Sequence, residues 1–315
     1  MATPRTPGPG QVPAGAPISN LIFQQLCELG LAAPERLEMV SPGTRDTEVP
    51  VYRDALSGVI VLGRNIYADP SGRGDVTVPC RPRDLNEVET SGGSVSTPVL
   101  DDGRRRFQQF QEHLRGKRVC DFGAGEGDFI ENCLQAGCAA SGVEQGATTI
   151  NKLRARFAER ALIAPDLDGL EGAFEVITLF HVLEHIEDHL GALRRIGAAL
   201  VEDGLLIVEV PHARDFLLQE MELPAFRDFT FWSEHLILHT RESLRAFLEA
   251  AGYSDVTVRG YQRYTFGNHL GWLRHGRPGG HEIFAHFSTP ELEKSYAAML
   301  EAQDRTDTLI ALARM

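Results

Sequence analysis

The feature that most constrains the fold is a short apolar strand followed at once by three closely spaced glycines, within residues 118–130. Residues 119–122 are predicted to form a buried strand, and a helix is predicted to begin at Asp128. Glycine has no Cβ and tolerates positive φ, so Gly123, Gly125 and Gly127 let the backbone turn sharply and approach a ligand closely. The amides at the helix start can then face that ligand, so the segment predicts a binding site.

Two classes of cofactor use such a turn, and the residue types separate them. A dinucleotide-binding loop has the pattern G-x-G-x-x-G, whose third glycine packs the turn against the helix. Counting from Gly123, that position holds Asp128. An acid, Asp121, also ends the strand, and it suits a cationic or hydroxyl-rich ligand better than a pyrophosphate. A nicotinamide dehydrogenase is therefore a disfavoured alternative.

Strands and helices alternate after the glycine turn. Strands are predicted at residues 139–144, 161–164, 174–180 and 205–210, and helices at residues 147–160 and 188–201. Elements of these lengths in this order favour a parallel sheet with helices on both faces. The predicted class is α/β, with a doubly wound, Rossmann-like, mostly parallel sheet.

The run D-x-G-x-G-x-G resembles motif I of the class I S-adenosylmethionine (SAM) methyltransferases, and the likeness extends over residues 118–261. It implies methyltransferase activity with SAM as the cofactor. In this family the glycine loop passes under the amino acid part of SAM, the acid after the second strand binds the ribose hydroxyls, and a polar residue after the third meets the adenine. The cofactor-binding residues implied are Asp121, Phe122, Gly123, Gly125, Gly127, Glu144, Asp166, Phe180 and His181.

Composition limits the partners and the compartment. The 315-residue chain has a net charge of −13, which argues against a protein that holds nucleic acid mainly through phosphates. Its five cysteines form no C-x-x-C pair, so neither a disulfide framework nor a common zinc site is predicted. The chain has no apolar stretch of membrane-spanning length and no secretory h-region near its start. We therefore expect a cytoplasmic enzyme with no nucleic acid or membrane partner.

Four parts of the chain are predicted: a disordered tail (1–18), a small N-terminal α+β element (19–96), a SAM-binding core (97–261), and a substrate lid with a C-terminal helix (262–315). Ser19 is expected to cap a helix over residues 20–29, and residues 48–52 and 57–62 to form a β-hairpin. The hairpin resembles the zinc-binding module of sugar-modifying methyltransferases, although the metal-binding cysteines are absent.

Two further helices bear on the site and on assembly. An amphipathic helix over residues 100–114 is expected to close over the cofactor. A long helix beginning at Thr289 and Pro290 is predicted to run to the C-terminus, and its apolar face predicts either packing or a homodimer contact.

The run from His181 to His185 matches H-x-x-E-H, a pattern that binds zinc in one class of peptidases. In those enzymes the pattern lies in a long helix, whereas here it follows a buried strand directly. The sequence therefore predicts no metal site. The methyltransferase resemblance instead places His181 beside the cofactor, and Glu184 and His185 in the turn that starts the next helix.

Glu234 and His235 occupy a setting similar to the segment that carries the acid/base pair of sugar C-methyltransferases. Ser233 departs from that pattern, since those relatives tend to have a histidine there. His235, Glu234 and His181 are the candidate catalytic residues. A purely structural role for Glu234 remains an equal alternative, because only geometry can establish a general base.

Residues 259–281 hold four arginines and no acid, a local reversal of sign in an acidic chain. Guanidinium groups pair bidentately with phosphate or carboxylate, so a lid that binds an anionic acceptor is one interpretation. Its candidate residues are Arg263, Arg274, Arg277 and His281. The other interpretation is a solvated loop whose arginines pair with nearby acids.

The sequence thus predicts a SAM-dependent methyltransferase for a small anionic acceptor, such as a nucleotide-linked sugar or a natural-product intermediate. The alternatives are an RNA or protein methyltransferase and a non-catalytic SAM- or nucleotide-binding partner subunit.

Overall fold

The computed structural model describes residues 18, 20–66, 102–170 and 172–315. Its centre is a seven-stranded sheet in the order β10-β11-β8-β7-β4-β5-β6. The strands are β4 (Arg118–Phe122), β5 (Ala139–Val143), β6 (Leu162–Ala164), β7 (Phe174–Phe180), β8 (Leu200–Pro211), β10 (Ser254–Tyr261) and β11 (Thr308–Arg314). The pairs among β4, β5, β6, β7 and β8 are parallel, whereas β11 is antiparallel to both of its neighbours.

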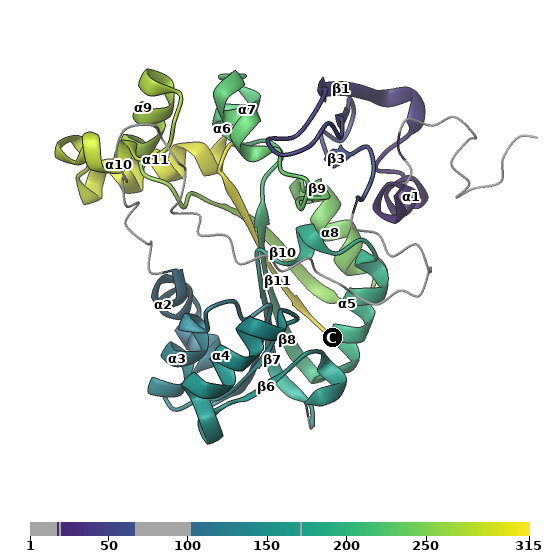
Figure 1. The fold of residues 1–315 in the computed structure, drawn as a ribbon, viewed down its shortest axis with the longest axis vertical. Helices are drawn as coiled ribbons and strands as arrows, with labels where there is room; N and C mark the ends of the chain where they lie inside the picture. Colours follow the sequence, from purple (N-terminus) through teal and green to yellow (C-terminus); the bar gives the residue numbers. More distant parts are fainter. Residues whose placement is uncertain (1–17, 19, 67–101, 171) are drawn as a thin grey trace, which may run out of the picture.

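Helices cover both faces of this sheet, as predicted. In Figure 1 the sheet is seen nearly edge-on, with α2 (Asp102–Leu114), α3 (Asp128–Gln135) and α4 (Ala147–Phe157) on one side and α5 (His189–Ala198) and α8 (Arg241–Ala250) on the other. Each side has its own apolar core. The doubly wound α/β prediction is therefore confirmed, and its strand and helix positions agree with the structure to within a few residues.

The turn between β4 and α3 shows why the sequence has glycine there. Gly123 and Gly127 have φ angles of 87° and 82°. A Cβ at Gly123 would lie 2.2 Å from the Val182 side chain, and one at Gly127 would lie 2.6 Å from the ring of Phe157. Both the backbone conformation and the lack of space exclude larger residues at these two positions.

A second, four-stranded sheet has the order β1-β2-β3-β9. Its strands are β1 (Leu37–Ser41), β2 (Val51–Asp54), β3 (Ile60–Leu62) and β9 (Ile237–Leu238), and α1 (Leu21–Glu28) and a 3₁₀ turn, η1 (Pro34–Arg36), precede them. The predicted hairpin is present as β2 and β3. Because β9 comes from the segment between α7 (Pro224–Thr230) and α8, the N-terminal element is joined to the main domain by strand pairing.

The predicted cap of the first helix is wrong. Asn20 is the N-cap, since its side-chain oxygen accepts a hydrogen bond from the backbone N–H of Phe23 at 2.8 Å. Ser19 lies outside the described residues. Asn and Ser are both favoured caps, so the pattern alone allowed either start.

Other helical segments follow the strands of the main sheet: η3 (Leu167–Gly169), η4 (Leu183–His185), α6 (Phe216–Gln219), α7 (Pro224–Thr230), α9 (Phe266–His275), α10 (Gly280–Ile283) and η5 (Ala285–Phe287). A further short segment, η2 (Ala158–Arg160), precedes β6. No helix in residues 20–66, 102–170 and 172–315 is long and apolar enough to cross a bilayer.

The prediction of a helix running to the C-terminus is also wrong. Helix α11 (Pro290–Ala302) begins as predicted, but the chain reverses at Asp304, whose φ is 57°, and ends as β11 in the main sheet. Leucine and alanine in this tail favour a helix by propensity. Tertiary packing overrides that preference, because Leu309, Ile310, Ala311 and Ala313 are buried between β8 and β10.

Candidate active site

The carboxylate of Asp121 lies at the end of β4, where the glycine turn begins. It is buried and accepts a hydrogen bond from the Thr178 hydroxyl of neighbouring β7, at 2.7 Å. Burial raises the pKa of Asp121 to about 7, against the lowering effect of Thr178 and Arg106. Because the surrounding groups stabilise its negative charge only weakly, this buried carboxylate would interact favourably with a bound cationic group.

Glu144, after β5, holds the other side of the turn. One carboxylate oxygen accepts a hydrogen bond from the amide of Gly125 at 3.0 Å, and the other accepts from the amides of Gln145 and Gly146 at 2.8 and 3.1 Å. Both acids predicted for the cofactor therefore flank the same glycine turn. The oxygen that accepts from Gly125 alone, Oε2, retains lone-pair capacity for a ligand hydroxyl.

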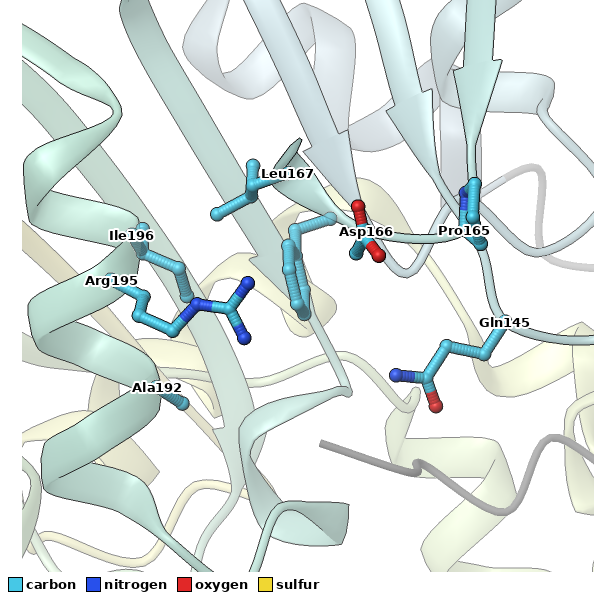
Figure 2. Close-up of a pocket in the computed structure, with 8 residues that line it drawn as sticks. Gln145, Pro165, Asp166, Leu167, Ala192, Arg195 and Ile196 are labelled. Carbon is cyan, nitrogen blue, oxygen red and sulfur yellow. The ribbon is translucent and has the colours of Figure 1, made fainter. Parts of the chain in front are cut away.

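A cavity opens beside this turn, with a volume of about 330 Å³ including its mouth. Figure 2 shows Gln145 and Asp166 on one side of it and Arg195 and Ile196 of α5 on the other. Phe122 also lines it, and its contact with the cofactor stays a prediction. Asp166 is exposed and caps η3 through a hydrogen bond from the amide of Gly169, at 3.0 Å. The cavity lies beside the turn where one end of the cofactor is expected.

Helix α2 packs beside the glycine turn, against the start of α3. A Cβ on Gly103 would lie 2.7 Å from the backbone of Asp128, so the start of α2 packs directly on the start of α3. Arg105 and Arg106 of this helix both reach Glu209 of β8, at 2.8 Å. The Arg106 guanidinium also lies 4.7 Å from the centroid of the Phe180 ring. These contacts hold α2 against β8 and the start of α3, and its closure over the cofactor stays a prediction.

The ring of Phe180 itself is buried, stacked on Phe110 and edge-on to Phe129. It belongs to an aromatic cluster with Phe110 of α2 and Phe129 of α3, and its contact with the cofactor stays a prediction.

His181 follows β7 with a φ of 56°, which is rare for a residue with a side chain. Its Nδ1 lies 3.1 Å from Glu184 Oε1 and its Nε2 lies 3.2 Å from Glu209 Oε1. Burial alone would lower the pKa of His181, but the contacts with Glu184 and Glu209 outweigh it and raise the pKa. A strained residue held between two buried carboxylates is the kind of feature that clusters at active sites.

Glu184 is fully buried and connects His181 to the second candidate segment, residues 234–236. The backbone carbonyl of Glu184 accepts a hydrogen bond from the amide of Leu236 at 2.9 Å. His185 Nδ1 donates to the backbone carbonyl of Glu234 at 2.8 Å, and the rings of His185 and His235 have centroids 5.0 Å apart. The structure thus brings His181, Glu184, His185 and His235 into one group, hereafter the histidine–glutamate cluster.

Glu184 and His185 were predicted only to support a helix start, but they occupy the middle of this cluster. The side chain of Glu234 is buried, and its backbone carbonyl makes the contact with the cluster. His181 and His185 do not share one face of a long helix, because they span a strand end and the three-residue η4. The arrangement therefore differs from the peptidase geometry that the H-x-x-E-H pattern suggested.

The predicted lid residues do not form one group in the described structure. Arg263 is half-buried and forms an ion pair with Asp102 at the start of α2. Arg274 and Arg277 are exposed, at and beyond the end of α9, and His281 lies in α10. Of the two interpretations of the arginines, the one in which they pair with nearby acids is therefore correct for Arg263.

Sequence reasoning missed Thr178, Arg105, Arg106 and Glu209. For Glu209 the signal was available, because it is the single charged residue in the apolar run at 205–210. For the arginines the signal was a basic run at 104–106 within an amphipathic helix. For Thr178 there was none, since threonine is common in strands.

Comparison with known proteins identifies the family of this chain. A methyltransferase-domain family matches residues 98–258, just over half of the chain. The ubiquinone biosynthesis O-methyltransferase of Stutzerimonas stutzeri (strain A1501) is 30% identical over 117 residues, which cover 34% of this chain and 50% of that protein. The match thus spans half of the length of that relative.

Solved structures with similar folds include a SAM-dependent methyltransferase from Archaeoglobus fulgidus, at 18% identity and a TM-score of 0.48, covering 67% of this chain and 92% of that one. Another is phosphoethanolamine N-methyltransferase 2 from Haemonchus contortus in complex with SAM, at 15% identity and a TM-score of 0.42, covering 68% of this chain and 52% of that one. With the family match over residues 98–258, and with Asp121 and Glu144 flanking the glycine turn, the chain belongs to the class I SAM-dependent methyltransferases.

Proposed function

We propose that this enzyme transfers the methyl group of SAM to a hydroxyl oxygen of a small anionic acceptor, of the natural-product intermediate type. The observation that carries the proposal is the histidine–glutamate cluster, which follows β7 directly, one strand from the glycine turn. An acceptor held there would face the carboxyl end of β4, where the methionine part of SAM is expected.

The reaction is a direct displacement. The acceptor oxygen forms a bond to the methyl carbon as the carbon–sulfur bond breaks, which leaves S-adenosylhomocysteine, and the hydroxyl proton leaves to solvent. Holding the reactants in line and excluding water supplies several kcal/mol of the rate enhancement, on the order of 7 or more in favourable cases. The cluster supplies imidazole nitrogens and carboxylate oxygens that can orient the hydroxyl.

The chemical character of the acceptor is inferred from a second, small cavity. His235 lines it together with apolar residues of β2 and β3, among them Val51 and Ile60. This apolar lining suits a compact natural-product intermediate better than the charged diphosphate of a nucleotide-linked sugar. An oxygen acceptor is supported by the O-methyltransferase relative.

We propose a negatively charged acceptor because two arginines near the C-terminal end of α9 could bind it. Arg274 and Arg277 are exposed, and neither takes part in an ion pair with any described residue. Arg263 is assigned instead to holding α2 through Asp102.

The test is a methylation screen with matched acceptors. Purified enzyme and SAM are incubated with hydroxybenzoates and catechol carboxylates, with the methyl ester of each, and with the corresponding amines. We expect methyl ethers of the free acids, detected by mass spectrometry, and a KM that rises severalfold for the esters. In Arg274→Ala/Arg277→Ala that difference should shrink. Products on nitrogen alone, or on RNA retained in filter binding, would refute the assignment of the acceptor.

A further inference from the structure

We propose that Glu184, His185 and His235 form a binding site for one divalent transition-metal ion of the zinc class. The proposal rests first on convergence: one ligand atom from each of these three residues lies within 4.8 Å of the others. Two imidazoles and one carboxylate are a donor set that zinc and iron(II) use in proteins, with a further position left open for a substrate or water.

Unsatisfied ligand atoms are the second observation. Among the described residues, Glu184 Oε2 and His235 Nδ1 are buried without a hydrogen-bond partner. Buried polar atoms are nearly always paired, and each such exception needs an explanation. A cation bound between them would satisfy both atoms at once.

The outer contacts also fit a metal site. His185 Nδ1 faces the carbonyl oxygen of Glu234 at 2.8 Å, and because a carbonyl only accepts, Nδ1 carries the proton and Nε2 keeps its lone pair. His181 Nδ1 holds Glu184 Oε1 at 3.1 Å, which leaves Oε2 as the free oxygen. Partners of this kind orient ligands around protein-bound metals.

The backbone holds the ligands together before any ion binds. Glu184 and His185 lie in η4, and the hydrogen bond from the Leu236 amide to the Glu184 carbonyl fixes the His235 segment against it. Two ligand atoms bound to one tetrahedral zinc ion lie about 3.4 Å apart, as each bond is about 2.1 Å long. Because the three ligand atoms already lie within 4.8 Å of one another, binding requires them to move closer together.

The metal inference deepens the proposed function and rests on it for its chemical purpose. A bound ion would hold the acceptor oxygen and favour loss of its proton. His235 would then be a ligand, in place of the general base that the sequence indicated. Zinc, cobalt(II) or iron(II) should bind, whereas magnesium, which prefers an all-oxygen shell, should bind poorly.

The test measures metal binding directly. Protein stripped with a chelator is titrated with Zn²⁺ by calorimetry and with Co²⁺ by visible absorption. We expect one equivalent to bind, and we expect Glu184→Gln, His185→Ala and His235→Gln each to weaken binding at least a hundredfold. His181→Ala should weaken it by about ten- to a hundredfold, as for partners of ligands elsewhere. The matched control is His113→Ala, since His113 is an exposed histidine on α2.

SAM titration of every variant confirms that the fold is intact, and His235→Gln, at a partly exposed position, provides the test if Glu184→Gln fails to fold. Absence of stoichiometric binding by the wild type, or equal binding by the ligand variants, would overturn the metal site. Full methyl transfer by the stripped enzyme would overturn its role while leaving the proposed function intact. Metal binding without methylation of any oxygen acceptor would refute the proposed acceptor and leave the metal site standing.

Discussion

The Thr178 hydroxyl donates a hydrogen bond to the Asp121 carboxylate across the β4–β7 pair, at 2.7 Å. This contact fixes the carboxylate at the edge of the glycine turn, in a place where burial opposes its ionisation. The geometry couples three properties: the protonation of Asp121, the stability of the free enzyme and the binding of the cationic cofactor.

Asp121 should make the stability of the free enzyme depend on pH. Burial raises its pKa from 3.8 to about 7, so the native protein keeps a proton that the unfolded chain loses. The associated stability is fully present below pH 3.8 and is lost as the pH rises through about 7. Urea unfolding of Asp121→Asn should lack this decline, and a decline identical to that of the wild type would contradict the assignment.

The same residue should link SAM binding to proton release. The positive charge of SAM favours the ionised carboxylate, so affinity should rise between about pH 6 and pH 8. Calorimetry in buffers of different ionisation enthalpy should detect the released proton. Asp121→Asn should bind SAM about ten- to a hundredfold more weakly, with no proton released, since it loses a charge-assisted contact. Asp166→Ala, which alters an exposed acid lining the first cavity, should change affinity far less.

Gly123 and Gly125 should respond very differently to alanine. Both have positive φ, but a Cβ at Gly123 would lie 2.2 Å from Val182, whereas one at Gly125 would meet nothing within 4 Å. Gly125→Ala should therefore lose about 1–2 kcal/mol of unfolding free energy, from backbone strain alone. Gly123→Ala should lose about 1–3 kcal/mol more, from overpacking.

A double variant separates the two causes at Gly123. Val182→Ala removes the side chain that the new Cβ would strike, so Gly123→Ala/Val182→Ala should recover the overpacking part of the loss. If chemical denaturation gave equal losses of unfolding free energy for Gly123→Ala and Gly125→Ala, the Val182 side chain would not be what excludes a Cβ at residue 123.

The sequence was most informative where one chemical requirement dominates. The glycine turn, its two acids and the parallel strands follow from local pattern, because only glycine fits those angles and buried parallel strands are apolar throughout. The histidine–glutamate cluster was predicted only in part, since the convergence of Glu184 and His235 depends on the contact between η4 and the start of β9. That contact joins residues about fifty positions apart, and no local pattern encodes it.

Glu209 should stabilise the closed position of α2. It is fully buried and contacts Arg105, Arg106 and His181. Glu209→Gln removes the charge between two half-buried guanidinium groups and should cost about 3–5 kcal/mol of unfolding free energy. Lys117→Met breaks the exposed pair with Glu175 and should leave stability nearly unchanged, because solvent screens it. Hydrogen exchange in α2 should rise in the Glu209 variant alone, and uniform exchange across both variants would contradict a role in closure.

The C-terminal strand shows how packing overrides local preference, and its contribution to stability can be measured. Ile310 is fully buried in β11, between β8 and β10. Ile310→Ala should therefore cost about 2–5 kcal/mol, the range for large-to-small changes in a core. Met299→Ala, on the exposed side of α11, should stay within about 0.5 kcal/mol. If the tail were helical in solution, Ile310→Ala would be as mild as Met299→Ala, and Ile310→Pro would leave the SAM-binding sheet folded. We expect instead that Ile310→Pro abolishes folding, because it removes a ladder hydrogen bond from the interior of the sheet.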